Sequence, residues 1–284
     1  MLEMPLVQFI IVVISMVNAL LTPATLYAYI TNRKSHPIIG MLFAHILTCL
    51  VFSVVFIVCG FIAILQFYLI IDIKMTTSFI LYSFEDATQN SVYFSGAFLA
   101  IDRVLVMTFP VRYTFCRMSM KLALATGVFN ALKLVGIFVT QVILKISPFK
   151  IGHKLTDVYN AVFIVEILLH VVFLIQSRIY AKRSKANAHV KQQMVQMNQI
   201  TLFQMISLLT FGVIPKVVYY VDQLALDLSI EIYLSLNWST NMRALDQVLF
   251  AVNVAVTTAF TLYKLKQRAK VTIVRASTIS WRNS

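Results

Sequence analysis

Long apolar stretches separated by short polar segments dominate this chain. Positions 6–30 contain no charged residue, and positions 38–71 contain no Asp, Glu, Lys or Arg. An α-helix rises about 1.5 Å per residue, so about 20 residues cross the roughly 30 Å hydrocarbon core of a bilayer. The pattern predicts seven membrane-spanning helices, at positions 6–30, 38–65, 75–107, 121–144, 158–177, 200–221 and 240–263.

The composition indicates the same class of protein. Hydrophobic residues make up 60% of the 284 residues and charged residues 12%, whereas soluble domains carry about 25% charged residues. We therefore predict an all-α membrane protein, a seven-transmembrane helix bundle with the lipid bilayer as its surroundings. Positions 1–263 form this bundle in the prediction, and positions 264–284 form a basic tail.

The positive charges predict the orientation of the bundle. If the N-terminus lies outside, 17 of the 24 Lys and Arg residues fall in cytoplasmic segments, six fall outside, and Lys133 falls within a span. The positive-inside rule therefore favours an outer N-terminus and a cytoplasmic C-terminus. With this placement the net charge of +13 is a topology signal, and we expect no nucleic-acid partner. Asn237 begins an Asn-Trp-Ser glycosylation pattern and falls on the outer side.

The stretch from Ala100 to Tyr113, AIDRVLVMTFPVRY, carries the most informative motif. Asp102 and Arg103 stand at the inner end of the third predicted span, and Pro110 follows. One interpretation is a plain interfacial anchor, in which Arg extends its charge to the membrane surface and Pro ends the helix. The other is a switch. A charged Arg at the edge of the hydrocarbon is costly unless paired, so Asp102 would hold it at rest until the helices part.

In its setting this stretch resembles the end of the third helix of rhodopsin-like G-protein-coupled receptors, where Asp-Arg-Tyr is followed by a Pro seven residues after the Arg. Short loops and termini make the chain similar to nematode serpentine chemoreceptors, among them the bc-type class. The resemblance implies a plasma-membrane receptor, in the ciliary membrane of a sensory neuron, that binds a small molecule and activates a heterotrimeric G protein. It implies no enzyme activity and no cofactor. The implied switch residues are Asp102, Arg103, Pro110, Tyr113, Pro215 and Asn253.

The chain also departs from this family. Val104 replaces the third motif residue, and Ser78 stands where the family has a disulfide-forming cysteine. The family's Asn-Pro-x-x-Tyr is reduced to Asn253, and Val213 occupies the position of an aromatic switch residue. Pro215 is in the family's position for a helix kink, and the sequence leaves open whether it is a hinge or only a tolerated kink.

Polar residues in the outer halves of the spans are candidates for a ligand pocket. Glu85 precedes Arg103 by eighteen residues, which is about 27 Å of helix. The alternative for Glu85 is a solvated helix end, and aromatic residues at this depth often anchor the interface. The pocket candidates are Glu85, Asp86, Tyr93, Lys216, Tyr219 and Asp246.

Two further polar residues lie at mid-span. Lys133 and Glu166 are each twelve residues from the inner end of neighbouring predicted helices, which suggests a buried ion pair at matching depth. Glu166 and His170 are four residues apart and share a helix face. Two such ligands without a third favour internal pairing over a metal site.

A transporter or channel is the alternative function. Lys133, Glu166, His170 and Asp246 would then line the pathway. Transporters tend to show internal repeats and Gly- or Pro-interrupted helices, and this sequence shows neither. An enzyme would need a clustered catalytic set, which the sequence does not offer.

Overall fold

The computed structural model describes residues 3–32, 40–68, 71, 75–109, 112–113, 116–139, 149–183, 188–215, 217 and 245–267. These residues are helical apart from short turns, which confirms the all-α prediction. The helices are α1 (Glu3–Asn32), α2 (Gly40–Phe67), α3 (Met75–Thr108), α5 (Met118–Phe138), α6 (Phe149–Arg183), α7 (Ala188–Leu208) and a last helix at Leu245–Gln267. A π-helical turn, η3 (Leu209–Val213), continues α7.

Six of the described helices are long and apolar enough to cross a membrane. Their candidate spans are Leu6–Thr31, Gly40–Phe67, Ser83–Thr108, Met118–Phe138, Ala161–Ile179 and Leu245–Gln267. This is the length and composition of a multi-pass membrane protein. The predicted span at 200–221 is not among the six, because α7 begins with polar turns and residues 218–221 lie outside the described residues. A bundle of seven spans therefore stays a prediction.

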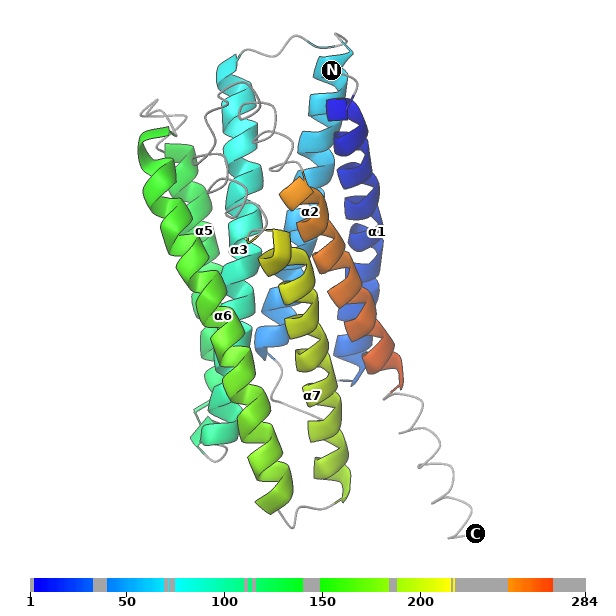
Figure 1. The fold of residues 1–284 in the computed structure, drawn as a ribbon, viewed down its shortest axis with the longest axis vertical. Helices are drawn as coiled ribbons and strands as arrows, with labels where there is room; N and C mark the ends of the chain where they lie inside the picture. The colour runs from blue at the N-terminus through cyan, green and yellow to red at the C-terminus, as the bar shows by residue number, and fades with distance from the viewer. Residues whose placement is uncertain are drawn as a thin grey trace.

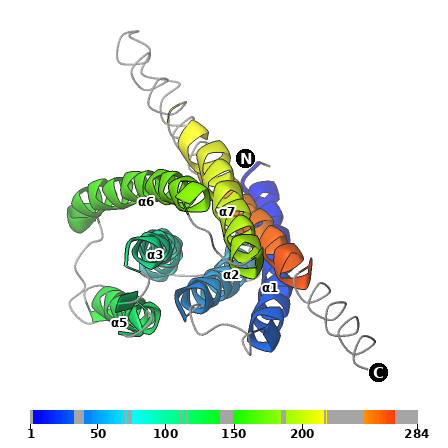
Figure 2. The same ribbon diagram turned by 90° about the horizontal axis from the view of Figure 1, so that it is seen from below.

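Helix α3 lies in the middle of the arrangement. It packs against α2, α5 and α6, and the view along the bundle shows these three helices around it (Figure 2). In the span of α3 56% of the residues are buried, compared with 6% in α5. Most polar residues of α3 from Thr88 to Arg103 are thus buried, whereas α5, which lies at the edge of the bundle (Figure 1), has few buried residues.

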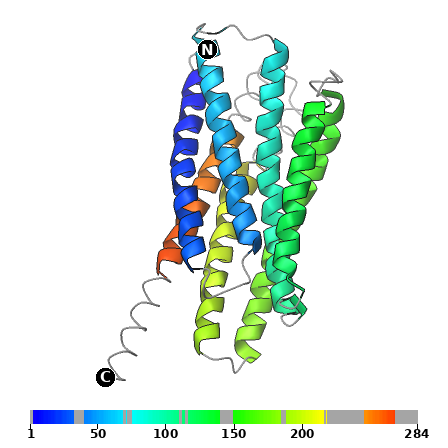
Figure 3. The ribbon, with the colours of Figure 1, turned by 180° about the vertical axis from the view of Figure 1, so that it is seen from behind.

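The last helix packs against both α1 and α7. Its Leu265 belongs to the same buried cluster as Tyr29 of α1, and its Phe260 stacks on Phe203 of α7 with ring centroids 3.9 Å apart. Helices α1 and α2 lie side by side, as the view from behind shows (Figure 3). The last helix therefore packs between α1 and α7.

The π-turn η3 precedes Pro215. A proline has no backbone N–H, so the ordinary hydrogen bond to the carbonyl four residues earlier cannot form at this position. The backbone hydrogen bonds of the helix form a π-helical turn over Leu209–Val213 instead. Gly212 in this turn faces Phe163 of α6, and a Cβ at Gly212 would lie 2.8 Å from Phe163 Cζ. Pro215 is thus associated with a local irregularity where α7 and α6 approach closely.

Candidate functional site

Arg103 ties the C-terminal end of α3 to α7. Its Nη1 donates hydrogen bonds to Thr201 Oγ1 and Gln204 Oε1, each at 2.7 Å. Thr201 and Gln204 are three residues apart and therefore share one face of α7. Arg103 is only 6% exposed, so neutral oxygens of a neighbouring helix take the place of water around its charge. We call Arg103, Thr201 and Gln204 the α3–α7 latch.

Asp102 contacts a different part of the molecule. Its carboxylate accepts hydrogen bonds from the hydroxyls of Tyr113 and Ser119. Ser119 Oγ in turn accepts the backbone N–H of Met41 at 3.0 Å. Burial and the nearby Asp102 charge raise the pKa of the Tyr113 hydroxyl, so it keeps the proton that it donates. The two residues predicted to hold each other thus have separate hydrogen-bond partners, Arg103 on α7 and Asp102 at the start of α5.

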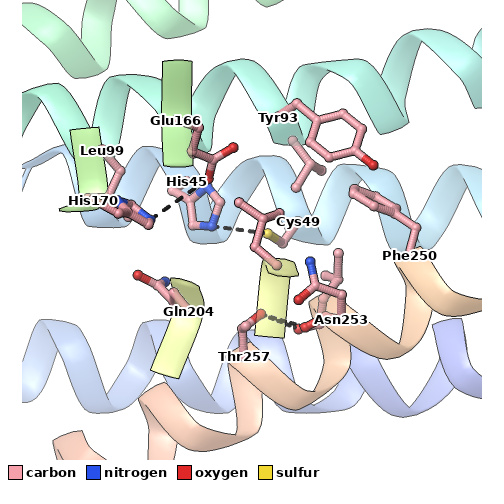
Figure 4. A pocket seen from close by; sticks show the side chains of 14 residues that line it. His45, Cys49, Tyr93, Leu99, Glu166, His170, Gln204, Phe250, Asn253 and Thr257 are labelled. Carbon is pink, nitrogen blue, oxygen red and sulfur yellow. Dashed lines mark hydrogen bonds and ion pairs between the residues drawn. The ribbon is translucent and has the colours of Figure 1, made fainter. Parts of the chain in front are cut away.

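A cavity lies directly beside the latch. Its volume of about 40 Å³ has room for about two water molecules. The wall comes from α2, α3, α6, α7 and the last helix (Figure 4). Gln204 belongs both to this wall and to the latch. The lining residues are His45, Cys49, Val92, Tyr93, Gly96, Leu99, Glu166, His170, Gln204, Leu208, Phe250, Asn253, Val254 and Thr257.

Glu166 and His170 of α6 supply the polar groups on one side of the cavity. Glu166 Oε1 lies 4.0 Å from His170 Nε2, and both side chains are buried. The Glu166 carboxyl rests on Gly96 of α3, where any Cβ would overlap it. Within the described part of the chain, no three His, Cys, Asp or Glu residues are grouped closely enough to hold a metal ion.

His45, on the opposite side of the cavity, has a polar neighbour at each of its ring nitrogens. Its Nδ1 lies 2.8 Å from Ser95 Oγ, and the Ser95 hydroxyl donates to the Val92 carbonyl at 2.9 Å. Ser95 therefore accepts from His45, which places the imidazole proton on Nδ1. The remaining nitrogen, Nε2, faces Cys49 Sγ at 3.8 Å. This geometry fits a neutral, internally bonded histidine.

Asn253 and Tyr93, like Glu166, are predicted site residues that the fold brings into the cavity wall. Ser207 of α7 donates to Asn253 Oδ1 at 2.6 Å, which joins α7 to the last helix. The Tyr93 ring packs on Phe163 and Phe250, with centroids 5.4 and 4.7 Å apart. Tyr93 therefore belongs to the aromatic core and lines the cavity.

Of the other pocket candidates, Glu85 and Asp86 lie in the N-terminal part of α3, and Asp246 of the last helix lies close enough for its charge to act on Asp86. Asp86 Oδ2 accepts a hydrogen bond from Asn90 at 3.2 Å, and the charges of Asp246 and Lys133 act on it. Glu85 is adjacent and partly buried. Lys216, Tyr219, Pro110 and Asn237 lie outside the described residues.

The predicted ion pair between Lys133 and Glu166 is wrong. Lys133 Nζ donates to the Ala87 carbonyl at 2.9 Å, whereas Glu166 rests on Gly96. These two positions are nine residues apart on α3, which is about 13 Å along the helix. The reason is the order of the helices, because α3 lies between α5 and α6 (Figure 2).

The latch partners were not predicted from the sequence. Thr201 and Gln204 are ordinary polar residues in a mixed stretch. Their spacing of three, opposite a predicted Arg at the same end of the bundle, is the signal that would have singled them out.

The geometry and the six candidate spans define a helical, multi-pass membrane protein with a buried polar centre. Compared with models of protein families and with curated proteins, the chain shows no match.

Proposed function

We propose that this chain is a seven-transmembrane chemosensory receptor that binds a small molecule, an odorant or a metabolite, and activates a heterotrimeric G protein. The N-terminus lies outside and the α3–α7 latch at the cytoplasmic face. The receptor belongs to the plasma membrane, in the ciliary membrane of a sensory neuron. The proposal follows the resemblance of the Ala100–Tyr113 stretch to rhodopsin-like receptors and to nematode serpentine chemoreceptors.

The observation that carries the proposal is the bonding of Arg103. A buried arginine joins the central helix to α7 through two neutral side chains. Two hydrogen bonds to a charged group contribute about 1.5 to 3 kcal/mol each, an amount that ligand binding can offset. When α7 moves away, both bonds break together, and Arg103 becomes available to acceptors on a docking G protein. A ligand favours that state only through its higher affinity for it.

The test replaces Arg103 with alanine. Cells that express the chain with a calcium reporter are screened with odorants and small metabolites, and nucleotide exchange on the G protein is then measured with the active compound. We expect Arg103→Ala to reach the cell surface and lose coupling. Arg112→Ala, an exposed arginine at the same end of α3, is the matched control and should keep it. Normal coupling by Arg103→Ala at matched surface levels would refute the proposal.

A transporter or channel is the second candidate function. It is favoured by the polar cavity that Glu166, His170 and His45 line in the middle of the bundle. Intramembrane polar groups that face a cavity mark ion and proton pathways in many membrane proteins. Substrate-dependent flux or current in reconstituted vesicles, without nucleotide exchange on a G protein, would establish it over the receptor.

A further inference from the structure

The pair formed by Glu166 and His170 has open polar positions. Glu166 is 7% exposed and His170 is 2% exposed. Among the described residues no hydrogen-bond partner reaches Glu166 Oε2 or His170 Nδ1. Buried polar atoms are nearly always bonded, so unbonded ones need an explanation. An acid and a base are thus held 4.0 Å apart, each with one free position, beside a cavity large enough for water.

The groups around this pair come from every helix that packs on it. From α2 come the internally bonded His45 and the Cys49 thiol. From α3 come the Tyr93 hydroxyl and Arg103. The cavity residues of α7 and of the last helix are uncharged, and they are Gln204, Leu208, Phe250, Asn253, Val254 and Thr257. Within the described residues, Arg103 is therefore the permanent positive charge that acts on the pair.

We propose that Glu166 and His170 form one proton-binding site in the core of the bundle, and that its occupancy is coupled to the α3–α7 latch. With one proton, on the carboxyl or on the imidazole, the pair carries no net charge. Without it the pair carries one negative charge, which is costly to bury away from a positive partner. Arg103 is that partner, seven residues and about 10 Å along α3 from Gly96, on which the Glu166 carboxyl rests.

The direction of the coupling follows from charge. Loss of the proton strengthens the attraction that keeps Arg103 inside the bundle, so the closed latch is favoured at higher pH. Uptake of the proton weakens this attraction, so the open latch is favoured at lower pH. Opening the latch favours proton uptake by the same factor. Two unit charges about 10 Å apart at an effective dielectric constant of about 20 change such an equilibrium on the order of tenfold.

The first experiment measures the latch directly. Spin labels are placed at Thr108 and Gln199, which are exposed near the latch on α3 and α7, in a background in which the exposed Cys116 is serine. The purified full chain in lipid nanodiscs is studied by double electron–electron resonance at mildly acid and mildly alkaline pH. We expect the long-distance population to grow on the order of tenfold on acidification. Glu166→Gln should show the long distance at both pH values, and Asp157→Asn, at a position of the same helix nine residues before Glu166, should keep the response.

The second experiment identifies the group that binds the proton. Infrared difference spectra between the same pH values should contain a carboxyl or imidazole band that Glu166→Gln or His170→Gln removes. His170→Gln tests the base of the pair in the same way. Circular dichroism and elution profile establish that each variant is folded.

Three results would overturn the proposal. One is an equal pH response in Glu166→Gln and in the unaltered chain. Another is a distance distribution independent of pH, together with no band that depends on either residue. The third is a distance distribution that does not respond to pH but does respond, at constant pH, when sodium is replaced by N-methylglucamine. That result would show that the pair binds a metal cation and not a proton. Neither measurement uses a ligand or a G protein. The proton site can therefore be refuted without refuting the receptor function, and the receptor function can be refuted without refuting the proton site.

Discussion

The latch and the cavity are neighbouring levels of the same bundle, and they are built in opposite ways. At the latch the charge of Arg103 is met by two close acceptors, and Asp102 is met by two hydroxyl donors. At the cavity, Glu166 Oε2 and His170 Nδ1 have no hydrogen-bond partner among the described residues. A satisfied network specifies one arrangement and resists change. A pair with open positions can still take up a further hydrogen-bond partner.

Gln204 connects the two levels, because its side chain lines the cavity and also accepts a hydrogen bond from Arg103. A charged group in the cavity is therefore separated from Arg103 by the single side chain of Gln204. Variants at each level show whether the cavity is tightly packed and whether the latch is a single bonded unit.

The largest effect on thermal stability is expected for Gly96→Ala at the cavity. The added Cβ would overlap the Glu166 carboxyl, and overpacking of a core costs about 1 to 3 kcal/mol. The midpoint temperature of thermal unfolding, measured on the purified protein in detergent, should fall by several degrees. Gly127→Ala is the matched control, because its Cβ meets nothing within 4 Å on the exposed face of α5. That variant should gain about 0.5 to 1 kcal/mol from the helix preference of alanine. Equal stability of the two variants would show that Glu166 is loosely held.

At the latch, Thr201→Val keeps the shape of the side chain and removes one acceptor from Arg103. A hydrogen bond to a charged group contributes about 1.5 to 3 kcal/mol, so the open population should rise on the order of tenfold or more. Basal nucleotide exchange without ligand measures this rise. Thr210→Val, on an exposed threonine bonded only to the Ile206 carbonyl in the described residues, should leave the basal level unchanged. A matching increase in both variants would place the effect in helix stability and not in the latch.

The smallest effect is expected for Tyr113→Phe. Asp102 loses one of its two hydroxyl donors and keeps Ser119, so the cost should lie at the low end of the range of about 1.5 to 3 kcal/mol for a hydrogen bond to a charged group. The midpoint of thermal unfolding should fall slightly, and Arg103 should stay bonded to α7. If Tyr113→Phe raised the open latch population as strongly as Thr201→Val does, Asp102 and Arg103 would act as one unit. That result would contradict the inference, drawn from their separate hydrogen-bond partners, that they act independently.

Much of the fold followed from the sequence, and part of the site did as well. The six candidate spans coincide with predicted spans, because hydropathy and length are properties of contiguous segments. The position of Arg103 at one end of α3 and the shared face of Glu166 and His170 also follow from spacing along a single helix. Tyr93, a predicted pocket residue, lines the cavity, but its packing in the aromatic core was not foreseen, because spacing along one helix does not show which rings of other helices it will meet.

The order and rotation of the helices were decided only by the tertiary structure. Hydropathy shows that a helix crosses the membrane, and it does not show which helices become neighbours. Placing α3 between α5 and α6 separated Lys133 from Glu166. The two partners of Arg103 lie 98 and 101 residues away in the chain. Such contacts depend on how side chains of different helices fit together, and this fit is a property of the packed bundle and not of any one segment.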